Sequence, residues 1–248
     1  MSDADVGGLE IAPTRIFPET PYGQLSQAVQ FSRMLEAEYG LAVSSMQSIW
    51  FGVPEPLFGT DGERRVLIDY TSRAIDFAAA LGCPNLVFGC PKNRAVPDGM
   101  AQDTALGIAC DFFREIGDWA VKGGTCIALE PNPPIYNTNF INTTREAVAL
   151  CRTLDHPGVK LNVDLGALIY NGETIQLIGD NMDLVNHVHI SEPHLRPIEK
   201  RQLHMDLLKV LREQKYSKFV SIEMSAPEDL GPVKAAVLYM KEMLDDLS

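Results

Sequence analysis

The sequence predicts an α/β fold of the (β/α) TIM-type barrel kind, formed as a single domain over residues 1–248. Two observations carry this prediction. Short β-rich runs alternate with amphipathic helical patterns along the chain, which is typical of βαβ units and a parallel sheet. Four of these runs stop at an acid or a histidine, and polar, Gly or Pro residues follow. A (β/α) barrel positions its chemistry in this way, at the carboxyl ends of its strands.

Seven strands are predicted in chain order, and helical patterns separate most of them. The strands are Val6–Ile11, Leu41–Met46, Asn85–Phe88, Thr125–Leu129, Lys160–Val163, His187–Ile190 and Phe219–Ile222. The clearest helices are Gln24–Tyr39, Asp61–Leu81, Asp98–Gly123, a segment that Thr143 or Thr144 caps and that ends at Leu154, Met205–Gln214 and Pro227–Leu247. A closed barrel of this type has eight strands, so one is missing from this count.

The four runs that stop at a charged group end in Glu130, Asp164, His189 and Glu223. A lone acid at a strand end is usually a helix N-cap or a solvated loop residue. These four, however, follow one another at steps of 34, 25 and 34 residues, each close to one βα unit. Three carboxylates and one imidazole at one mouth predict a divalent metal site that suits Mn²⁺, Mg²⁺ or Co²⁺, with Zn²⁺ as a further option.

Other polar residues near the same strand ends are candidates for substrate binding. They are Gln47, Lys92, Asn132, Glu192, His194, Arg196 and His204. The alternatives are core packing for Gln47 and a solvated loop for Lys92 and its neighbour Arg94. His187 shares a strand face with His189 and would lie deeper, where it packs or orients the metal ligand. Glu10, within the first strand, is interpreted as structural.

Composition excludes several classes of function. The net charge of −12 argues against nucleic acid as a partner, because phosphate binding needs a basic surface. There is no apolar run of 18 residues, so no membrane span is expected. The N-terminal MSDADVGG has no apolar signal region. Five scattered cysteines without a CxxC motif fit free thiols in a reducing cytoplasm.

The motifs LEIAPTRIF, FGCPKNR, LEPNPPIYNTNF, NVDLGALIYNGE, HVHISEP and VSIEM together resemble the xylose isomerase-like TIM barrels, the sugar phosphate isomerase/epimerase superfamily. The resemblance covers essentially the whole chain. It implies that Glu130, Asp164, His189 and Glu223 hold the metal and that Glu130 and Glu223 transfer protons. It also implies that the first βα unit is the missing one. Because the strands at the resulting gap would have unpaired edges, a homo-oligomer or another closure is expected to cover them.

The sequence departs from the ketose 3-epimerases of that superfamily at two positions. Tyr136 stands where they have a second glutamate, and Ala167 stands where they have a histidine. In those epimerases the glutamate and the histidine bind the sugar near the reacting carbons. Their absence here disfavours an epimerase of free ketohexoses. The nuclease branch needs additional histidine ligands for a three-zinc cluster, and this chain has only five histidines.

The expected function is therefore a metal-dependent isomerase or epimerase acting on a sugar, a sugar phosphate or a related keto-polyol through an enediolate. One alternative is a dehydratase or lyase of the same fold, in which the enediolate expels a β-hydroxyl group. Another is a non-catalytic sugar-binding subunit. The expected partner is a small carbohydrate, with neither nucleic acid nor membrane.

Overall fold

The computed structural model describes residues 6–226 and 229–247, and within them seven parallel strands form one nearly closed barrel. The strands follow one another around the sheet in chain order, β1 to β7. They are β1 Gly8–Ile11, β2 Ala42–Met46, β3 Leu86–Phe88, β4 Ile127–Leu129, β5 Val159–Asp164, β6 Val185–Ile190 and β7 Val220–Ile222. The α/β barrel and its seven strands, as predicted from the sequence, are confirmed.

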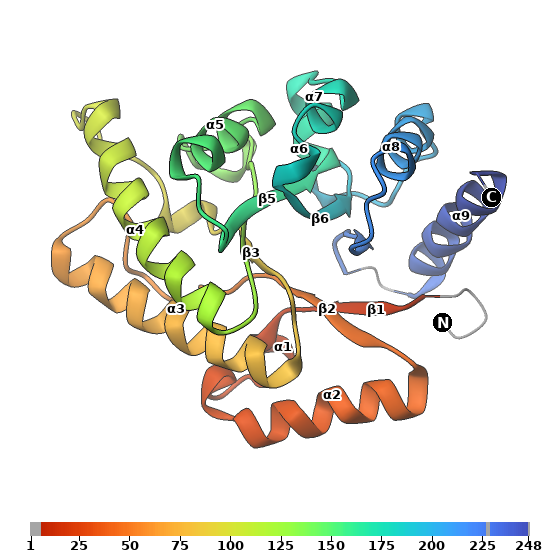
Figure 1. Ribbon diagram of the computed structural model, residues 1–248, viewed down its shortest axis with the longest axis horizontal. Coiled ribbons are helices and arrows are strands. Elements are labelled where there is room, and N and C mark those ends of the chain that lie inside the picture. The colour runs from red at the N-terminus through yellow and green to blue at the C-terminus, as the bar shows by residue number, and fades with distance from the viewer. Residues whose placement is uncertain (1–5, 227–228, 248) are drawn as a thin grey trace.

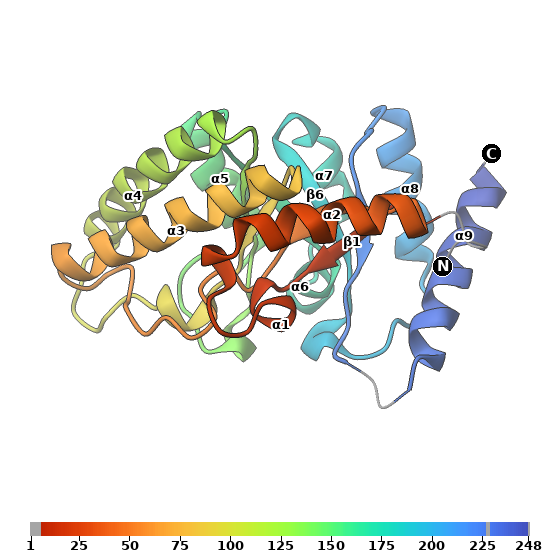
Figure 2. The same ribbon diagram turned by 90° about the horizontal axis from the view of Figure 1, so that it is seen from below.

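Helices surround the strands on the outside (Figures 1 and 2). They are α1 Pro13–Ile16, α2 Leu25–Tyr39, α3 Asp61–Leu81, α4 Gln102–Lys122, α5 Thr144–Leu154, α6 Leu165–Asn171, α7 Ile175–Gly179, α8 Gln202–Glu213 and α9 Gly231–Leu247. The sequence patterns located the long helices, but they missed α1 and α6. These two are short and begin directly after strand ends, in stretches that lack a full amphipathic repeat. Residues 227–228, at the predicted start of the last helix, lie outside the described part.

Local sequence signals explain where the helices begin. Thr60 accepts a hydrogen bond from the backbone N–H of Glu63, and the Glu63 carboxylate accepts one from the N–H of Thr60, which makes a capping box at α3. Thr143 and Glu146 make the same arrangement at α5, so Thr143 rather than Thr144 caps that helix. Each box satisfies backbone N–H groups that the helix itself leaves unpaired.

Strand β5 alternates between an apolar outer face and a polar inner face. In β5, Leu161 and Val163 belong to the hydrophobic core, whereas Asn162 and Asp164 are buried polar residues. Aromatic rings fill the layer next to β3 and α4, where the ring centroids of Trp50 and Phe88 lie 4.7 Å apart. Because successive side chains on a strand point to opposite faces, this pattern directs the polar groups into the barrel.

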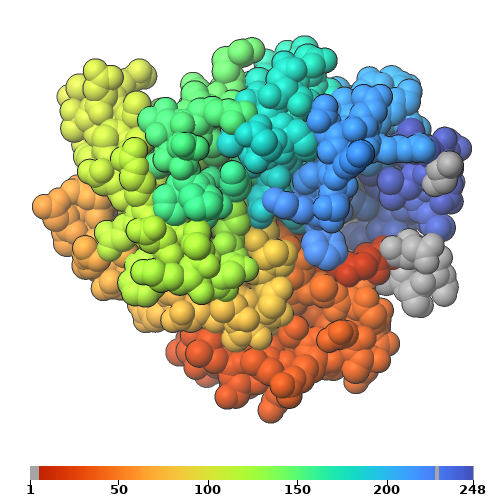
Figure 3. All heavy atoms as spheres, in the orientation of Figure 1, coloured from red at the N-terminus to blue at the C-terminus, as the bar shows by residue number. Residues whose placement is uncertain are grey.

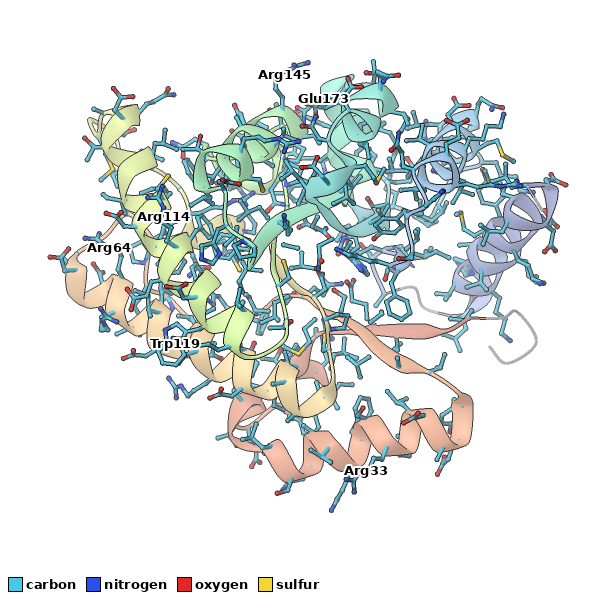
Figure 4. The ribbon with its side chains drawn as sticks, viewed as in Figure 1. Arg33, Arg64, Arg114, Trp119, Arg145 and Glu173 are labelled. Atoms are coloured by element: carbon cyan, nitrogen blue, oxygen red, sulfur yellow. The ribbon has the colours of Figure 1, made fainter. Side chains whose placement is uncertain are left out.

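Charged side chains lie mainly on the outer helices. Figure 4 labels examples at the periphery, which point away from the sheet: Arg33, Arg64, Arg114 and Arg145. In the described part of the chain, no helix is both long enough and apolar enough to cross a membrane. The acids and histidines inside the barrel are therefore set apart from the solvated charges of the surface.

The wall of the barrel is open between β1 and β7, since no backbone pairing joins these strands within the described residues. A cavity of about 630 Å³ lies along this opening, with β1, β7 and α9 among its walls and with Glu10, Gln47 and Glu223 among its lining residues. On the face drawn in Figure 3, the red of the first strand borders the blue of the C-terminal elements. A partner copy that closes this opening remains a prediction.

Gly8 lets the two edge strands approach each other at this opening. A Cβ atom at Gly8 would lie 2.8 Å from the ring of Phe219 and 2.8 Å from Cβ of Ser44. We expect Gly8→Ala to lower the free energy of unfolding by about 1–3 kcal/mol, the usual cost of overpacking. Gly7→Ala is the matched control, because nothing lies within 4 Å of its Cβ position. Equal denaturant midpoints for the two variants would contradict this account of the wall.

Candidate metal centre

Four side chains from successive strands meet at the carboxyl end of the barrel. Glu130 follows β4, Asp164 ends β5, His189 lies in β6 and Glu223 follows β7. Each offers one ligand atom, and these atoms all lie within 4.8 Å of one another. The sheet register brings them together, because Asp164 is paired with His189 and Glu223 N donates to Ile190 O at 2.9 Å.

His189 lies at the middle of this cluster. Its Nδ1 is 3.0 Å from Oε1 of Glu130 and 3.2 Å from Oε2 of Glu223. On the other side of the ring, Nε2 is 2.9 Å from Oε2 of Glu10. A proton on Nε2 that is donated to Glu10 leaves Nδ1, which faces the carboxylates, as the ring atom that can bind a metal ion once its own proton has left. Metal-binding histidines are commonly oriented by a carboxylate in this way.

Hydrogen bonds fix the carboxylates as well. The Asn162 amide donates to Oε1 of Glu130 at 2.9 Å, and the Asn132 amide donates to Oε2 at 3.1 Å. Asp164 accepts from the N–H of Ala167 through Oδ1, at 2.5 Å, and from the Ser191 hydroxyl through Oδ2, at 2.6 Å. A carboxylate oxygen can accept more than one bond, so the contacts orient these oxygens without excluding a cation.

Burial and mutual repulsion dominate the electrostatics of the cluster. Burial raises the pKa of Asp164 to about 7, and the charges of Glu130 and Glu223 add to this rise. The pKa of Glu223 is also raised, chiefly by burial. Burial alone would lower the pKa of His189, but Glu10 and Glu223 outweigh it and raise this pKa well above its usual value. Three buried carboxylates around one imidazole nitrogen are a donor set that fits a divalent cation.

Glu10 and His187 form a second layer beneath His189. Burial would raise the pKa of Glu10, but the charge of His189 and its hydrogen bond lower this pKa to about 2. His187 Nε2 lies 3.5 Å from Glu10 and 2.9 Å from the Ser221 hydroxyl. Burial, with the nearby charge of His189, lowers the pKa of His187 to about 4, so this ring is neutral at pH 7. Glu10 therefore serves as the charged partner of His189.

The candidate substrate-binding residues have different surroundings. Gln47 donates to Glu10 Oε1 at 3.1 Å and lines the wall cavity, while Asn132 contacts Glu130. Lys92, His194 and Arg196 are exposed. Two others are engaged elsewhere. Glu192 is buried and bound to Arg201 through two contacts of 2.7 and 2.6 Å, and His204 is buried on α8 with Nδ1 3.2 Å from the Tyr239 hydroxyl.

Sequence reasoning passed over four residues that support the site. Glu10 was interpreted as structural, although a lone acid inside an apolar strand is a signal of its own. Asn162 shares the inner face of its strand with Asp164, so alternation alone could have found it. Ser191 carries no pattern that distinguishes it. Arg94, predicted either to bind an anionic or hydroxyl-rich substrate or to lie in a solvated loop, is fully buried and donates to the carbonyl oxygen of Glu130 at 2.9 Å.

Comparison with known proteins identifies the family. The family model for the xylose isomerase-like TIM barrel matches residues 2–243. The chain belongs to this family. The resemblance inferred from the motifs is thereby confirmed.

The individual proteins that resemble this chain have low sequence identity to it. A ketose 3-epimerase from Arthrobacter globiformis is 27% identical over 176 residues, which are 67% of this chain and 57% of that protein. This chain thus spans little more than half the length of the curated relative. Among solved structures, the 3-keto-D-glucoside 4-epimerase of E. coli has a TM-score of 0.74 and 22% identity, over 99% of this chain and 90% of that one. The IolI protein with a bound zinc atom has a TM-score of 0.71 and 17% identity, over 99% and 87%.

The charge states of the cluster predict that metal binding releases protons. Below about pH 7, Asp164 carries a proton that a cation must displace. Because the pKa of His189 is raised, its ring carries a second proton that must leave. Metal affinity should therefore rise as the pH increases toward 7. Titration calorimetry with Mn²⁺ at pH 6, in buffers of different ionisation enthalpy, measures the protons released. An affinity that does not change between pH 5.5 and 7.5 would rule out this competition.

Glu10→Gln tests the orienting contact separately. The amide keeps the shape but removes the charge that holds the Nε2 proton of His189, so metal affinity should fall by about 10–100-fold. Glu38→Gln, on the exposed end of α2, is the control and should bind metal like the wild type. Metal content after dialysis against graded chelator concentrations gives the affinities. Equal values for both variants would mean that Glu10 has no influence on the metal site.

Proposed function

We propose that this protein is a metal-dependent sugar isomerase or epimerase that moves a proton on the carbon next to a carbonyl group. One observation carries the proposal: Glu130 and Glu223 reach the same nitrogen of His189 from strands β4 and β7, at 3.0 and 3.2 Å. Oxygens of two carboxylates thus meet at one ring nitrogen, and the family resemblance implies that the two glutamates act from opposite sides of the metal. The family relationship and the epimerase names of similar proteins support a carbohydrate as the substrate.

The four residues Glu130, Asp164, His189 and Glu223 would hold the cation. When bound, the metal supplies positive charge that makes the α-proton of the substrate more acidic. One of the two glutamates removes this proton, and the electron pair moves into an enediolate. The other glutamate returns a proton to the opposite face, or to the neighbouring carbon in an isomerisation. Asp164 has no proton-transfer role in this scheme and serves as a ligand only.

The finer assignments belong to the same proposal. Oxygen-rich ligand sets suit Mn²⁺, Mg²⁺ or Co²⁺, and a single imidazole also admits Zn²⁺. We assign Gln47 and Asn132 as substrate contacts, together with Lys92, His194 and Arg196 at the rim. The cysteines of the described chain are free, which supports a reducing cytoplasm. We also retain a homo-oligomer, since two unpaired strand edges favour coverage by another molecule.

The direct test is exchange of the substrate α-proton with solvent. The protein is loaded with Mn²⁺ and incubated in D₂O with D-fructose, D-allulose and D-tagatose, with the phosphate esters of these sugars, and with methyl 3-keto-α-D-glucopyranoside. NMR follows deuterium incorporation. If the α-proton of a sugar exchanges only when metal is bound, and the mass of the sugar changes only by the deuterium taken up, the isomerase is supported. Loss of water by mass spectrometry would assign a dehydratase instead. Metal binding without any turnover would leave a non-catalytic binding protein.

Variants separate proton transfer from metal binding. At saturating Mn²⁺, Glu130→Gln and Glu223→Gln should each lower kcat by about 10²–10⁴, the usual contribution of a positioned acid or base. Asp164→Asn should instead recover most of its activity as the metal concentration rises, because its role is ligation. Metal content is measured in parallel to show that each variant is loaded. Near-normal turnover in both glutamine variants would refute the two-glutamate mechanism.

A further inference from the structure

The cavity in the open wall continues from the inside of the barrel to the outside of the sheet. Ser221 of β7 lines it on the inner side, where the hydroxyl lies 2.9 Å from Nε2 of His187. Val220 and Ile222 line it from the opposite face of the same strand. Glu223, one of the candidate metal ligands, also lines it. The cavity therefore connects the metal centre with the space between the sheet and α9.

The lining of this wall cavity combines a polar part with an apolar part. The polar part includes two contacts of His189 and consists of Glu10, Ser44, Gln47, Ser221 and Glu223. The apolar part comes from α8, the outer face of β7 and α9, and includes Leu208, Val220, Ile222, Val233, Val237 and Met240. Small-molecule sites commonly have apolar walls, a few polar groups and volumes of about 300–1,000 Å³, a range that includes the 630 Å³ of this cavity. The lining thus fits a ligand with a polar head and an apolar tail.

One face of α9 is directed at the wall cavity. Val233, Val237 and Met240 follow one another at steps of four and three residues, which places them on the same side of the helix. A different side chain attaches α9 to α8, since the Tyr239 hydroxyl lies 3.2 Å from Nδ1 of His204. Val233 and Val237 are half-buried. An apolar group in the cavity would remove their remaining surface from water, which is favourable in proportion to the area covered.

Ser44 supplies a polar group at the narrow part of the opening. Its Cβ lies 2.8 Å from the Cβ position of Gly8, which is the place where β1 approaches Phe219. The Ser44 side chain is 1% exposed, and its hydroxyl has no hydrogen-bond partner among the described residues. A buried hydroxyl without a partner is unfavourable, so a bound molecule that supplies an acceptor there is stabilised.

The width of the opening favours a small molecule over an additional strand. Cα atoms of β1 and β7 approach each other within 8 Å. Two strands that flank a third strand lie about 9.5 Å apart, twice the usual spacing between neighbouring strands. The ring of Phe219 beside Gly8 narrows the opening further. A chain of single-bonded atoms or a flat ring is thinner than a strand, and the opening suits such a group.

We propose that the wall cavity binds an apolar substituent of the sugar, an alkyl or aryl group attached through a glycosidic oxygen. The sugar lies inside the barrel at Glu223, the glycosidic oxygen accepts a hydrogen bond from Ser44, and the substituent passes between β1 and β7 to contact α9. The assignment rests on the proposed isomerase or epimerase function and narrows its substrate class. Because a glycosidic bond blocks the anomeric carbon, the carbonyl group of such a substrate lies at another carbon of the ring.

The test compares glycosides that differ only in the length of their substituent. Calorimetry measures binding of methyl, butyl and hexyl 3-keto-α-D-glucopyranoside to the Mn²⁺-loaded protein. Each methylene group that enters the cavity should strengthen binding roughly fourfold. Val237→Asp places a charge on the apolar wall, so the methyl and hexyl compounds should bind this variant equally. Val66→Asp, on the exposed side of α3, is the control and should keep the preference of the wild type.

Two milder variants make the test independent of the stability of Val237→Asp. Val237→Ser removes apolar surface without adding a charge and should reduce the preference for the hexyl compound. Ser44→Ala should weaken binding of all three glycosides by roughly two- to tenfold, the usual contribution of one hydrogen bond, and should leave the gain per methylene group unchanged. Metal content and thermal midpoints are measured for every variant.

Exchange of the α-proton separates this assignment from the proposed function. KM for exchange should fall from the methyl to the hexyl compound in parallel with the dissociation constant. Exchange with equal affinity for all three glycosides would overturn the assignment and leave the proposed function intact. A preference for the hexyl compound without exchange of any sugar would refute the proposed function but not the cavity site. If the hexyl compound binds only by dissociating a dimer, as sedimentation velocity would show, a second copy occupies the cavity and the assignment is wrong.

Discussion

The arrangement of the barrel mouth depends on His189, which contacts carboxylates on both sides of its ring. Nδ1 faces Glu130 and Glu223 at 3.0 and 3.2 Å, and Nε2 faces Glu10 at 2.9 Å. Buried carboxylates without a positive partner are costly, and this cost would otherwise be met by protonation. A cation at Nδ1, together with a fixed proton at Nε2, stabilises all three acids at once. The parallel register supplies the geometry, because strand ends that lie side by side place one ligand each.

Residues in the surrounding loops hold the carboxylates of the cluster in position. Asp164 caps α6 through the Ala167 N–H, so the metal-facing carboxylate also fixes the start of a helix. Gly89 is needed beside Glu130, because a Cβ atom there would lie 2.6 Å from Oε2 of Glu130. Arg94 holds the carbonyl oxygen of the same glutamate. Asp164 and Glu130 are thus oriented by groups outside the cluster.

The sequence predicted the sheet and the four converging residues because these depend on short patterns. An apolar run that stops at Glu130 or Asp164 is visible without knowledge of distant contacts. The second layer was missed for a different reason. Glu10 meets His189 over 179 residues of chain, and Arg94 is buried only because loop 131–141 folds over it. Glu192 and His204, which are predicted to bind substrate, contact Arg201 and Tyr239 in the structure, and no local pattern encodes those contacts.

The open wall and the metal centre are parts of one arrangement. Glu10 belongs to β1 and Glu223 follows β7, the two strands that leave the barrel unpaired, and both contact His189 on β6. Side chains therefore connect the two edges where backbone hydrogen bonds do not. Charge-assisted contacts of this kind are stronger than neutral ones, particularly where water is excluded. The imidazole of His189 thus joins the two edge strands at the place where the candidate metal ligands meet.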